Sequence, residues 1–416
     1  MFETEIKPPK IMLVAVDVGE YNVEDSLDEL EELTNTAGGE VVVRITQKRP
    51  TFDSATCIGS GRLEEMSQIC ENEEIDQIIF DHELTATQIR NIEDVTKVHT
   101  IDRTMLILDI FAGRATTREG RLQVELAQNK YRLPRLAGMG IKLSRLGGGI
   151  GTRGPGETKL ETDKRHIRTR ISALSEELKE IEKRREFQRA RRKKDGVLVC
   201  AIVGYTNVGK STLLNTMTHA GVLAENKLFA TLETTSRAIE LPDGRSVMLV
   251  DTVGLIRRLP HHLVEAFKST LEEAANADVI LHICDASNDN CQEQAKVTLE
   301  LLKELGCEDI PVVTVLNKCD LVPYIDEMDF SGDDSSVVKI SAKKGEGLER
   351  LLEAITEALP KSAVRMRILL PFDKAGILSK IRIDGKVFTE EYTADGIECD
   401  VLVDIKILSQ VEGFRI

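Results

Sequence analysis

Gly204-Tyr205-Thr206-Asn207-Val208-Gly209-Lys210-Ser211 fits the pattern G-x-x-x-x-G-K-[ST] of a phosphate-binding loop. The loop follows an apolar run at 197–203 that predicts a buried strand, and it precedes Thr212, where a helix should start. Strand, glycine loop and helix form the context that this motif requires. We therefore expect the loop N–H groups to hold the phosphates of a nucleotide, with Lys210 on the β- and γ-phosphates and Ser211 on Mg²⁺.

Three more motifs follow predicted strands and identify the nucleotide. Asp251-Thr252-Val253-Gly254 is placed to hold the Mg²⁺ shell through water and to sense the γ-phosphate through the glycine N–H. In Asn317-Lys318-Cys319-Asp320, one carboxylate can accept both N1–H and the N2 amine of guanine, a pair that adenine lacks. The backbone of Ser341-Ala342-Lys343 can contact guanine O6. Together the motifs predict a GTP-binding site.

The segment between the first two motifs, Phe229-Ala230-Thr231-Leu232-Glu233, predicts a switch loop. One threonine here should ligate Mg²⁺ when GTP is bound; we predict Thr231, with Thr234 as the alternative. We expect Lys210, Thr231 and Gly254 to act in catalysis. Leu255 stands where some GTPases place a glutamine that orients water, so we expect slow intrinsic hydrolysis that a partner accelerates. His261 and His262 are expected on the surface.

The bulk composition indicates a cytosolic protein of two or three domains. Among 416 residues, 30% are charged and 41% hydrophobic, and no apolar run approaches the roughly 20 residues that span a bilayer. The first ten residues have no apolar stretch like that of a signal peptide. Eight cysteines include no C-x-x-C pair, and we expect them to be reduced core residues.

The charge is unevenly distributed along the chain. The whole chain carries −15, but residues 114–194 hold 23 Lys and Arg against 10 Asp and Glu, a balance of +13 that leaves −28 for the remainder. This contrast predicts an acidic body with one basic arm. We name residues 114–195 the basic arm.

Four parts are expected along the chain. Residues 1–113 alternate strand-like and helix-like segments, which predicts a parallel α/β domain. In this part Asp81-His82-Glu83 is expected to be a polar loop at a strand end and not a metal or acid–base cluster. Residues 196–360 should form a doubly wound P-loop domain. Residues 361–416 should form a small α+β domain, with a hairpin at 381–388 around Asp384-Gly385 and a strand at 401–408.

The basic arm predicts an antiparallel helical hairpin with a glycine-rich tip. A first helix is expected over 119–132, ended by Pro134, and eight glycines follow between Gly138 and Gly156. Thr158 and Glu161 fit a capping box that would open a long helix to about Lys194, with apolar residues spaced as in a coiled coil. These residues are Ile167, Ile171, Leu174, Leu178 and Ile181. The tip could be a linker, a second phosphate loop or a nucleic-acid probe; we favour RNA binding.

With these motifs the chain resembles the HflX family, GTPases related to the Obg group. The resemblance extends over nearly the whole chain and includes Gly147-Gly-Gly-Ile-Gly-Thr-Arg-Gly-Pro-Gly-Glu-Thr158, the phosphate loop, Phe229-Ala-Thr-Leu232 and Asp251-Thr-Val-Gly-Leu-Ile256. It departs from the family at Glu233-Thr234, where Asp-Pro is usual, and the tail from Lys361 is not shared by all members. The third of these motifs supports Thr231 as the metal ligand.

The resemblance implies binding to the large ribosomal subunit near the peptidyl-transferase region, GTP hydrolysis stimulated by the ribosome, and dissociation of stalled or idle ribosomes. A cytoplasmic monomer is expected. Two other functions stay open from the residues: a GTP-regulated switch that acts on protein partners, and a P-loop phosphotransferase that acts on a small molecule. Salt-sensitive co-sedimentation with ribosomal subunits would distinguish the first of these from ribosome binding.

Overall fold

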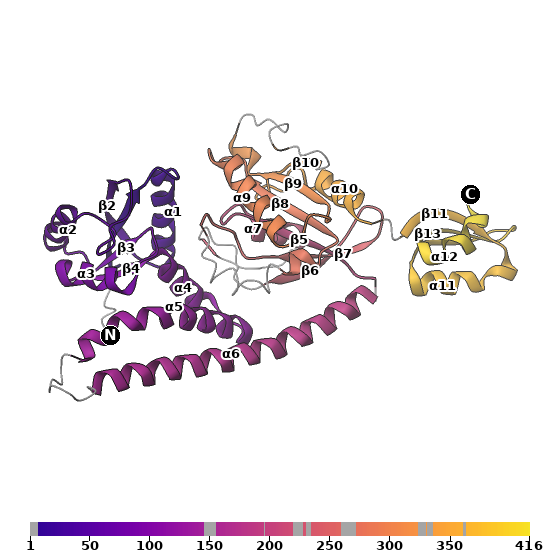
Figure 1. Cartoon of the computed structure of the whole chain (residues 1–416). Helices are drawn as coiled ribbons and strands as arrows, with labels where there is room; N and C mark the ends of the chain where they lie inside the picture. The colour runs from indigo at the N-terminus through magenta and orange to yellow at the C-terminus, as the bar shows by residue number, and fades with distance from the viewer. Residues whose placement is uncertain are drawn as a thin grey trace, which may run out of the picture. The chain divides into compact units, whose positions relative to one another are not determined.

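The computed structural model describes residues 7–144, 155–194, 196–218, 228–229, 234–258, 272–322, 330, 336–360 and 363–416. The chain forms two compact units. The first contains residues 1–187 together with 225–233 and 256–269, and the second contains 188–224, 234–255 and 270–416. Figure 1 labels their helices and strands.

The first unit contains a four-stranded parallel sheet with strand order β2-β1-β3-β4. The strands are β1 (Lys10–Asp17), β2 (Glu40–Lys48), β3 (Gln77–Phe80) and β4 (His99–Asp102), and they alternate with α1 (Val23–Thr36), α2 (Ser60–Glu73), α3 (Ala86–Thr96) and α4 (Arg103–Arg114). The expected parallel α/β fold is confirmed. Parallel strands need crossover connections, and the helices provide them.

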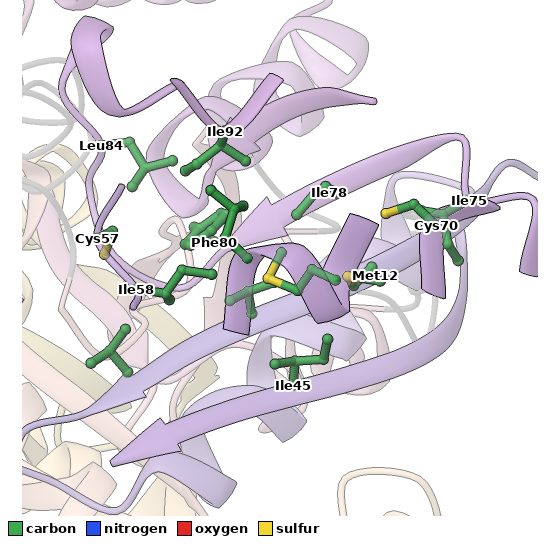
Figure 2. Packing of buried hydrophobic residues seen from close by; sticks show 14 residues of the cluster. Met12, Ile45, Cys57, Ile58, Cys70, Ile75, Ile78, Phe80, Leu84 and Ile92 are labelled. Carbon is green, nitrogen blue, oxygen red and sulfur yellow. The ribbon is translucent and has the colours of Figure 1, made fainter. Parts of the chain in front are cut away.

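One face of this sheet carries a closely packed apolar core. Met12 on β1 and Ile78 and Phe80 on β3 are fully buried, and Ile58 and Ile92 pack with them from the segments that cover the sheet (Figure 2). β1 and β3 form the centre of the sheet, so their side chains are nearly all apolar. This core fixes the position of the polar residues that follow β3.

The basic arm consists of two antiparallel helices, α5 (Arg118–Ser144) and α6 (Pro155–Lys194) (Figure 1). Arg118 pairs with Glu177 at 2.9 Å and Arg170 with Glu125 at 2.6 Å, so residue numbers fall along one helix as they rise along the other. Leu174, at the centre of the predicted apolar stripe, is fully buried. The predicted helical hairpin is confirmed, and the tip at 145–154 lies outside the described residues.

Two predicted helix ends in the arm are wrong. Pro134 lies inside α5 and does not end it. The Arg135 guanidinium donates to Tyr131 O at 3.1 Å and stacks 3.4 Å over the Tyr131 ring, contacts that stabilise the turn after the proline. In addition, α6 begins at Pro155, three residues before the predicted cap at Thr158. Proline suits the first turn because the N–H that it lacks has no helical partner there.

The second unit contains a six-stranded sheet with strand order β10-β9-β8-β5-β7-β6. Its strands are β5 (Leu198–Gly204), β6 (Thr235–Glu240), β7 (Ser246–Asp251), β8 (Val279–Asp285), β9 (Val312–Asn317) and β10 (Ser336–Lys339), and only the β6–β7 pair is antiparallel. The helices α7 (Lys210–Thr218), α9 (Cys291–Glu304) and α10 (Leu348–Ala358) accompany it. The chain builds the sheet on one side of β5 and then on the other, so β5 is the switch point where such folds bind ligands.

The C-terminal part of the second unit is a small α+β domain, as predicted. Its antiparallel sheet has strand order β11-β13-β12, formed by β11 (Ala363–Leu370), β12 (Lys386–Tyr392) and β13 (Ile397–Asp404). The helices are α11 (Gly376–Asp384) and α12 (Ile405–Val411). Three short 3₁₀ turns, η1 (Cys319–Leu321), η3 (Phe372–Lys374) and η4 (Glu412–Phe414), complete the described elements of this unit.

The predicted hairpin at 381–388 is wrong. Residues up to Asp384 form α11, because Leu378 and Ile381 recur at helical spacing and are both buried against the sheet. The predicted strand at 401–408 is also displaced, since β13 ends at Asp404 and α12 follows. None of the described helices is both long and apolar enough to cross a membrane.

Candidate nucleotide-binding site

The phosphate loop connects β5 to α7 at the switch point of the sheet. A Cβ at Gly204 would lie 2.3 Å from Ile283 O, so only glycine fits where the loop leaves β5 beside β8. Gly209 has φ +97°, and a Cβ there would lie 2.4 Å from Asn317 Nδ2. The two glycines of the motif are therefore required because Ile283 O and the Asn317 side chain lie close to the loop backbone. The loop leads directly into the N-terminus of α7.

Lys210 is buried and folded onto its own loop. Its Nζ donates to Gly204 O at 3.0 Å and to Tyr205 O at 2.6 Å. Burial lowers the pKa of Lys210 to about 8. A buried ammonium group with its donors turned into the loop is well placed to exchange these carbonyls for phosphate oxygens.

Ser211 and Asp251 meet at the end of the loop. The Ser211 Oγ donates to Asp251 Oδ2 at 2.7 Å, and the carboxylate is fully buried. Thr206 Oγ1 is also buried, with no hydrogen-bond partner among the described residues. Hydroxyl and carboxylate oxygens are the ligands that Mg²⁺ prefers. Ser211 and Asp251 thus fit a magnesium ion that also binds phosphate.

The segment after Asp251 pairs with the phosphate loop through its backbone. Thr206 N donates to Leu255 O at 2.8 Å, and Leu255 N donates to Gly204 O at 3.1 Å. A Cβ at Gly254 would lie 2.9 Å from Thr206 Cα and 3.1 Å from Lys210 Nζ, so this position must be glycine. Leu255 is itself buried. This close pairing brings the Gly254 backbone beside Lys210.

Asn317 joins the phosphate loop to the predicted guanine-binding segments. Its Nδ2 donates to Val208 O at 2.8 Å, and its Oδ1 accepts from Ala342 N at 2.9 Å. The hydrogen bond from Ser341 holds the pKa of Asp320 below its usual range, with a smaller contribution from Lys344. The structure therefore brings the segments around 204–211, 317–320 and 341–343 together at one edge of the sheet.

Two supporting residues were missed in the sequence. Asp285, the last residue of β8, accepts from Lys318 Nζ at 2.6 Å. Thr216 on α7 donates to Ala342 O at 2.8 Å. Asp285 could have been found as an acidic residue at the end of an apolar run, whereas Thr216 is one polar residue of a helix with no distinguishing pattern.

Only part of the predicted switch segment is described. Ala230, Thr231, Leu232 and Glu233 lie outside the described residues, as do His261 and His262. Phe229 is buried in the first unit with φ +54°, and its ring meets the Phe111 ring edge-on at 4.6 Å. Leu228 N donates to Thr36 Oγ1 at 3.2 Å. The described end of the segment is thus anchored on the N-terminal α/β fold.

Asp81 and His82 follow β3 and are both buried. Asp81 accepts hydrogen bonds from four side chains, at 2.8–3.0 Å. The donors are Tyr21, Ser26, Arg103 and Arg258. Burial lowers the pKa of His82 to about 4. Among the described residues, no group of three or more His, Cys, Asp or Glu could hold a metal ion.

Known protein families match three consecutive parts of the chain. Residues 24–112 match a family described as GTP-binding GTPase N-terminal, 114–192 its middle region, and 199–318 a family described as 50S ribosome-binding GTPase. A GTP-binding protein from Sulfolobus solfataricus, solved in complex with GDP, is 25% identical and covers 84% of this chain and 98% of its own, with a TM-score of 0.46.

Curated relatives are more similar. The GTPase HflX of Caldanaerobacter subterraneus subsp. tengcongensis is 50% identical over 98% of this chain and 94% of its own length. The GTPase HflX of Lacrimispora saccharolytica is 48% identical over 97% of this chain and 95% of its own. The GTPase HflX of Escherichia coli is 41% identical over 86% and 84%. With this identity over nearly its full length, and with a P-loop GTPase domain, the chain is a GTP hydrolase that belongs to the HflX family.

Proposed function

We propose that this GTPase binds the large ribosomal subunit through its basic arm and dissociates stalled or idle ribosomes. The observation that carries the proposal is the concentration of positive charge in one helical hairpin of an otherwise acidic chain. Arg165, Arg168 and Arg184 on α6 are exposed. Cations on a rigid helix suit the phosphate backbone of ribosomal RNA. The match to a family described as 50S ribosome-binding GTPase supports the same partner.

The nucleotide chemistry is assigned to the residues that converge at β5. Lys210 would neutralise the β- and γ-phosphates, and Ser211 and Asp251 would hold Mg²⁺, Ser211 directly and Asp251 through water; the 2.7 Å contact between these two residues supports this assignment. Thr231 is proposed as the second protein ligand, and the Gly254 N–H as the group that senses the γ-phosphate. Lys318 and Asp320 recognise guanine, supported by the backbone of 341–343. When bound, Mg²⁺ stabilises negative charge on the phosphates.

A partner is proposed to complete the catalytic site. Leu255 is buried and hydrogen-bonded through its backbone to the phosphate loop, so it presents no polar side chain to an attacking water. Intrinsic hydrolysis should then be slow, and the ribosome should accelerate it by completing the site around the attacking water. Loss of the γ-phosphate then releases the two proposed switch segments, around Thr231 and around Gly254, and this release resets ribosome binding. We propose a cytoplasmic monomer.

GTP turnover measured with and without purified large ribosomal subunits tests this proposal. We expect strong stimulation, and co-sedimentation that weakens steeply as salt rises. Replacing Arg165, Arg168 and Arg184 by Gln should weaken sedimentation and stimulation together, while basal GTP hydrolysis is unchanged. The matched control replaces three exposed lysines outside the arm and outside the nucleotide motifs, Lys97, Lys303 and Lys374, by Gln. No sedimentation at low salt would refute ribosome binding and favour a switch that acts on protein partners.

A further inference from the structure

The last turns of α6 carry an aromatic ring that faces solvent. Phe187 is 74% exposed, the most exposed phenylalanine in the described part of the chain. Among the described side chains of α6, no other large apolar one is exposed. A phenyl ring is a large, flat apolar surface that gains free energy when a partner covers it. This ring is therefore available to a ligand from outside the chain.

The opposite face of the helix is occupied by ion pairs within the protein. Arg185 pairs with Glu119 at 2.9 Å in the first unit, and Arg189 pairs with Glu273 at 2.9 Å in the second. These two arginines lie two residues before and two residues after Phe187, about 200° around the helix axis. The arginines on this side of α6 thus stabilise the fold and point away from the ring.

Four cations surround Phe187 on its own face, and we call Lys183, Arg184, Phe187, Arg191 and Lys194 the Phe187 face. Three of the cations precede or follow Phe187 by three or four residues, within about 60° around the axis, and the fourth lies about two turns further along. All five side chains are exposed, and α6 is one continuous helix through them.

The positive charge on this side of α6 is confined to its last turns. Residues 183–194 hold eight Lys and Arg against one Glu. Further toward the start of α6 the charges alternate, since Glu180 accepts from Lys183 at 2.9 Å and Glu176 lies 3.8 Å from Lys179. The Phe187 face is therefore a bounded patch in which one aromatic ring is enclosed by cations.

A ligand that matches this patch must combine a flat apolar surface with negative charge on both sides. A nucleotide of a single-stranded nucleic acid does so, because its base can stack on an aromatic ring while the adjacent phosphates meet Lys or Arg. A duplex does not, because its bases are already stacked on one another. An acidic lipid surface fits poorly, since a helix that lies on a membrane buries several apolar side chains, and this face offers one.

We propose that the Phe187 face binds one unpaired nucleotide of RNA, with the base stacked on Phe187 and the flanking phosphates on Arg184 and Arg191. The inference deepens the proposed ribosome binding and rests on it for the source of the strand. Pro155, where α6 begins after the glycine-rich segment, lies on the order of 50 Å away along the helix. The base of the arm would thus make an RNA contact of its own.

The test uses the full chain and two fluorescent probes, single-stranded oligo(U) of about 12 nucleotides and an RNA duplex of the same length. Phe187→Ala should raise the Kd for oligo(U) by about tenfold and leave the Kd for the duplex and the salt dependence unchanged. Phe187→Leu, which keeps an apolar side chain without a ring, should behave like Phe187→Ala, and Phe187→Trp should bind oligo(U) at least as tightly as the wild type.

The charged part of the site is tested separately. Arg184→Gln should reduce the slope of log Kd for oligo(U) against log salt by about 0.7, the value for one phosphate contact. Phe372→Ala, at another exposed phenylalanine outside the arm, is the matched control and should bind both probes as the wild type does. Every variant should keep its basal GTP hydrolysis, which shows that it is folded.

Three outcomes would overturn the inference: no loss of oligo(U) binding in Phe187→Ala, an equal loss for oligo(U) and the duplex, or binding to phosphatidylserine vesicles that depends on Phe187 while oligo(U) binding does not. Failure of the proposed function is distinguishable. In that case oligo(U) binding would depend on Phe187 as expected, but the wild type would not sediment with large ribosomal subunits.

Discussion

Arg258 Nη1 lies 2.8 Å from Asp81 Oδ2, although 177 residues separate the two in the chain. Asp81 is fully buried and accepts from Arg103 at 3.0 Å as well. Burial alone would raise the pKa of Asp81, but Arg103 and Arg258 outweigh it and hold the pKa below its usual range. Arg258, which follows the Asp251 motif, and Arg103, which follows β4, therefore bind the same buried carboxylate at the end of β3.

Replacing Asp81 by Ala should strongly destabilise the first unit. Arg103 is 3% exposed, and losing one of its carboxylate partners leaves a buried charge poorly compensated, which costs about 3–5 kcal/mol. Arg258→Ala should cost about 1 kcal/mol or less, because its side chain is 37% exposed and Asp81 keeps its other donors. Urea unfolding of the two variants, with the exposed Glu64→Gln as control, measures both. Equal costs would contradict this, because they would show that loss of the Arg258 pair alone accounts for the effect of losing Asp81.

The buried Lys210 should make the nucleotide-free protein more stable at high pH. The pKa of Lys210 is lowered to about 8 in the folded chain, against about 10.4 when unfolded. Between these values the unfolded chain binds more protons, so the free energy of unfolding rises with pH, by on the order of 3 kcal/mol across the window. Lys210→Met should lack this gain. Urea unfolding at pH of about 7.5 and about 10 measures the free energy of unfolding of the wild type and of the variant. A difference between the two proteins that does not change with pH would contradict the prediction.

Asp320→Asn should remove the preference for guanine. The amide cannot accept from both N1–H and the N2 amine, so GDP affinity should fall by about 100-fold or more. Xanthine carries an oxygen where guanine carries that amine, so the variant should gain affinity for xanthosine diphosphate. Competition among guanosine, adenosine and xanthosine diphosphates measures the change, and the exposed Asp309→Asn is the control. An unchanged preference for guanosine would remove Asp320 from base recognition.

His282 should contribute to acid sensitivity. It is fully buried on β8, and burial lowers its pKa to about 4, against about 6.5 in the unfolded chain. As pH falls through this window the unfolded chain takes up the proton first, so stability is lost, by on the order of 3 kcal/mol in total. His282→Asn should unfold with a shallower dependence on pH, measured by urea unfolding. His166→Asn, at an exposed position, should keep the wild-type slope; a parallel slope for His282→Asn would show that other groups dominate.

The nucleotide motifs were readable from the sequence because each follows one of the parallel strands of a single sheet. Gly204, Asp251 and Asn317 end β5, β7 and β9, and the carboxyl ends of parallel strands meet at one edge. Short local patterns could thus be assembled into a site without knowing the strand order. The pairing of Asp285 with Lys318 required that β8 and β9 be neighbours, which no local pattern states.

The errors also have physical causes. Pro134 continues a helix because Arg135 reaches back to Tyr131 and across to Asp102, 33 residues earlier, a contact that only the folded chain provides. The Asp384-Gly385 pair resembles a hairpin turn. However, Leu378 and Ile381 recur at helical spacing and are buried in the core, and this burial favours a helix up to Asp384 more strongly than the local pair favours a turn. Glycine is required at 385 for another reason, since a Cβ there would lie 2.1 Å from Leu402 O.

The two hydrogen bonds of Asn317 have a kinetic consequence. One side-chain amide ties Val208, in the loop that we propose holds the phosphates, to Ala342, in the loop that we propose holds the base. A nucleotide held by both loops would then dissociate without an intermediate in which the base is released while the phosphates stay bound, or the reverse. Nucleotide exchange should follow a single exponential, and an exchange factor that loosens either loop would open both.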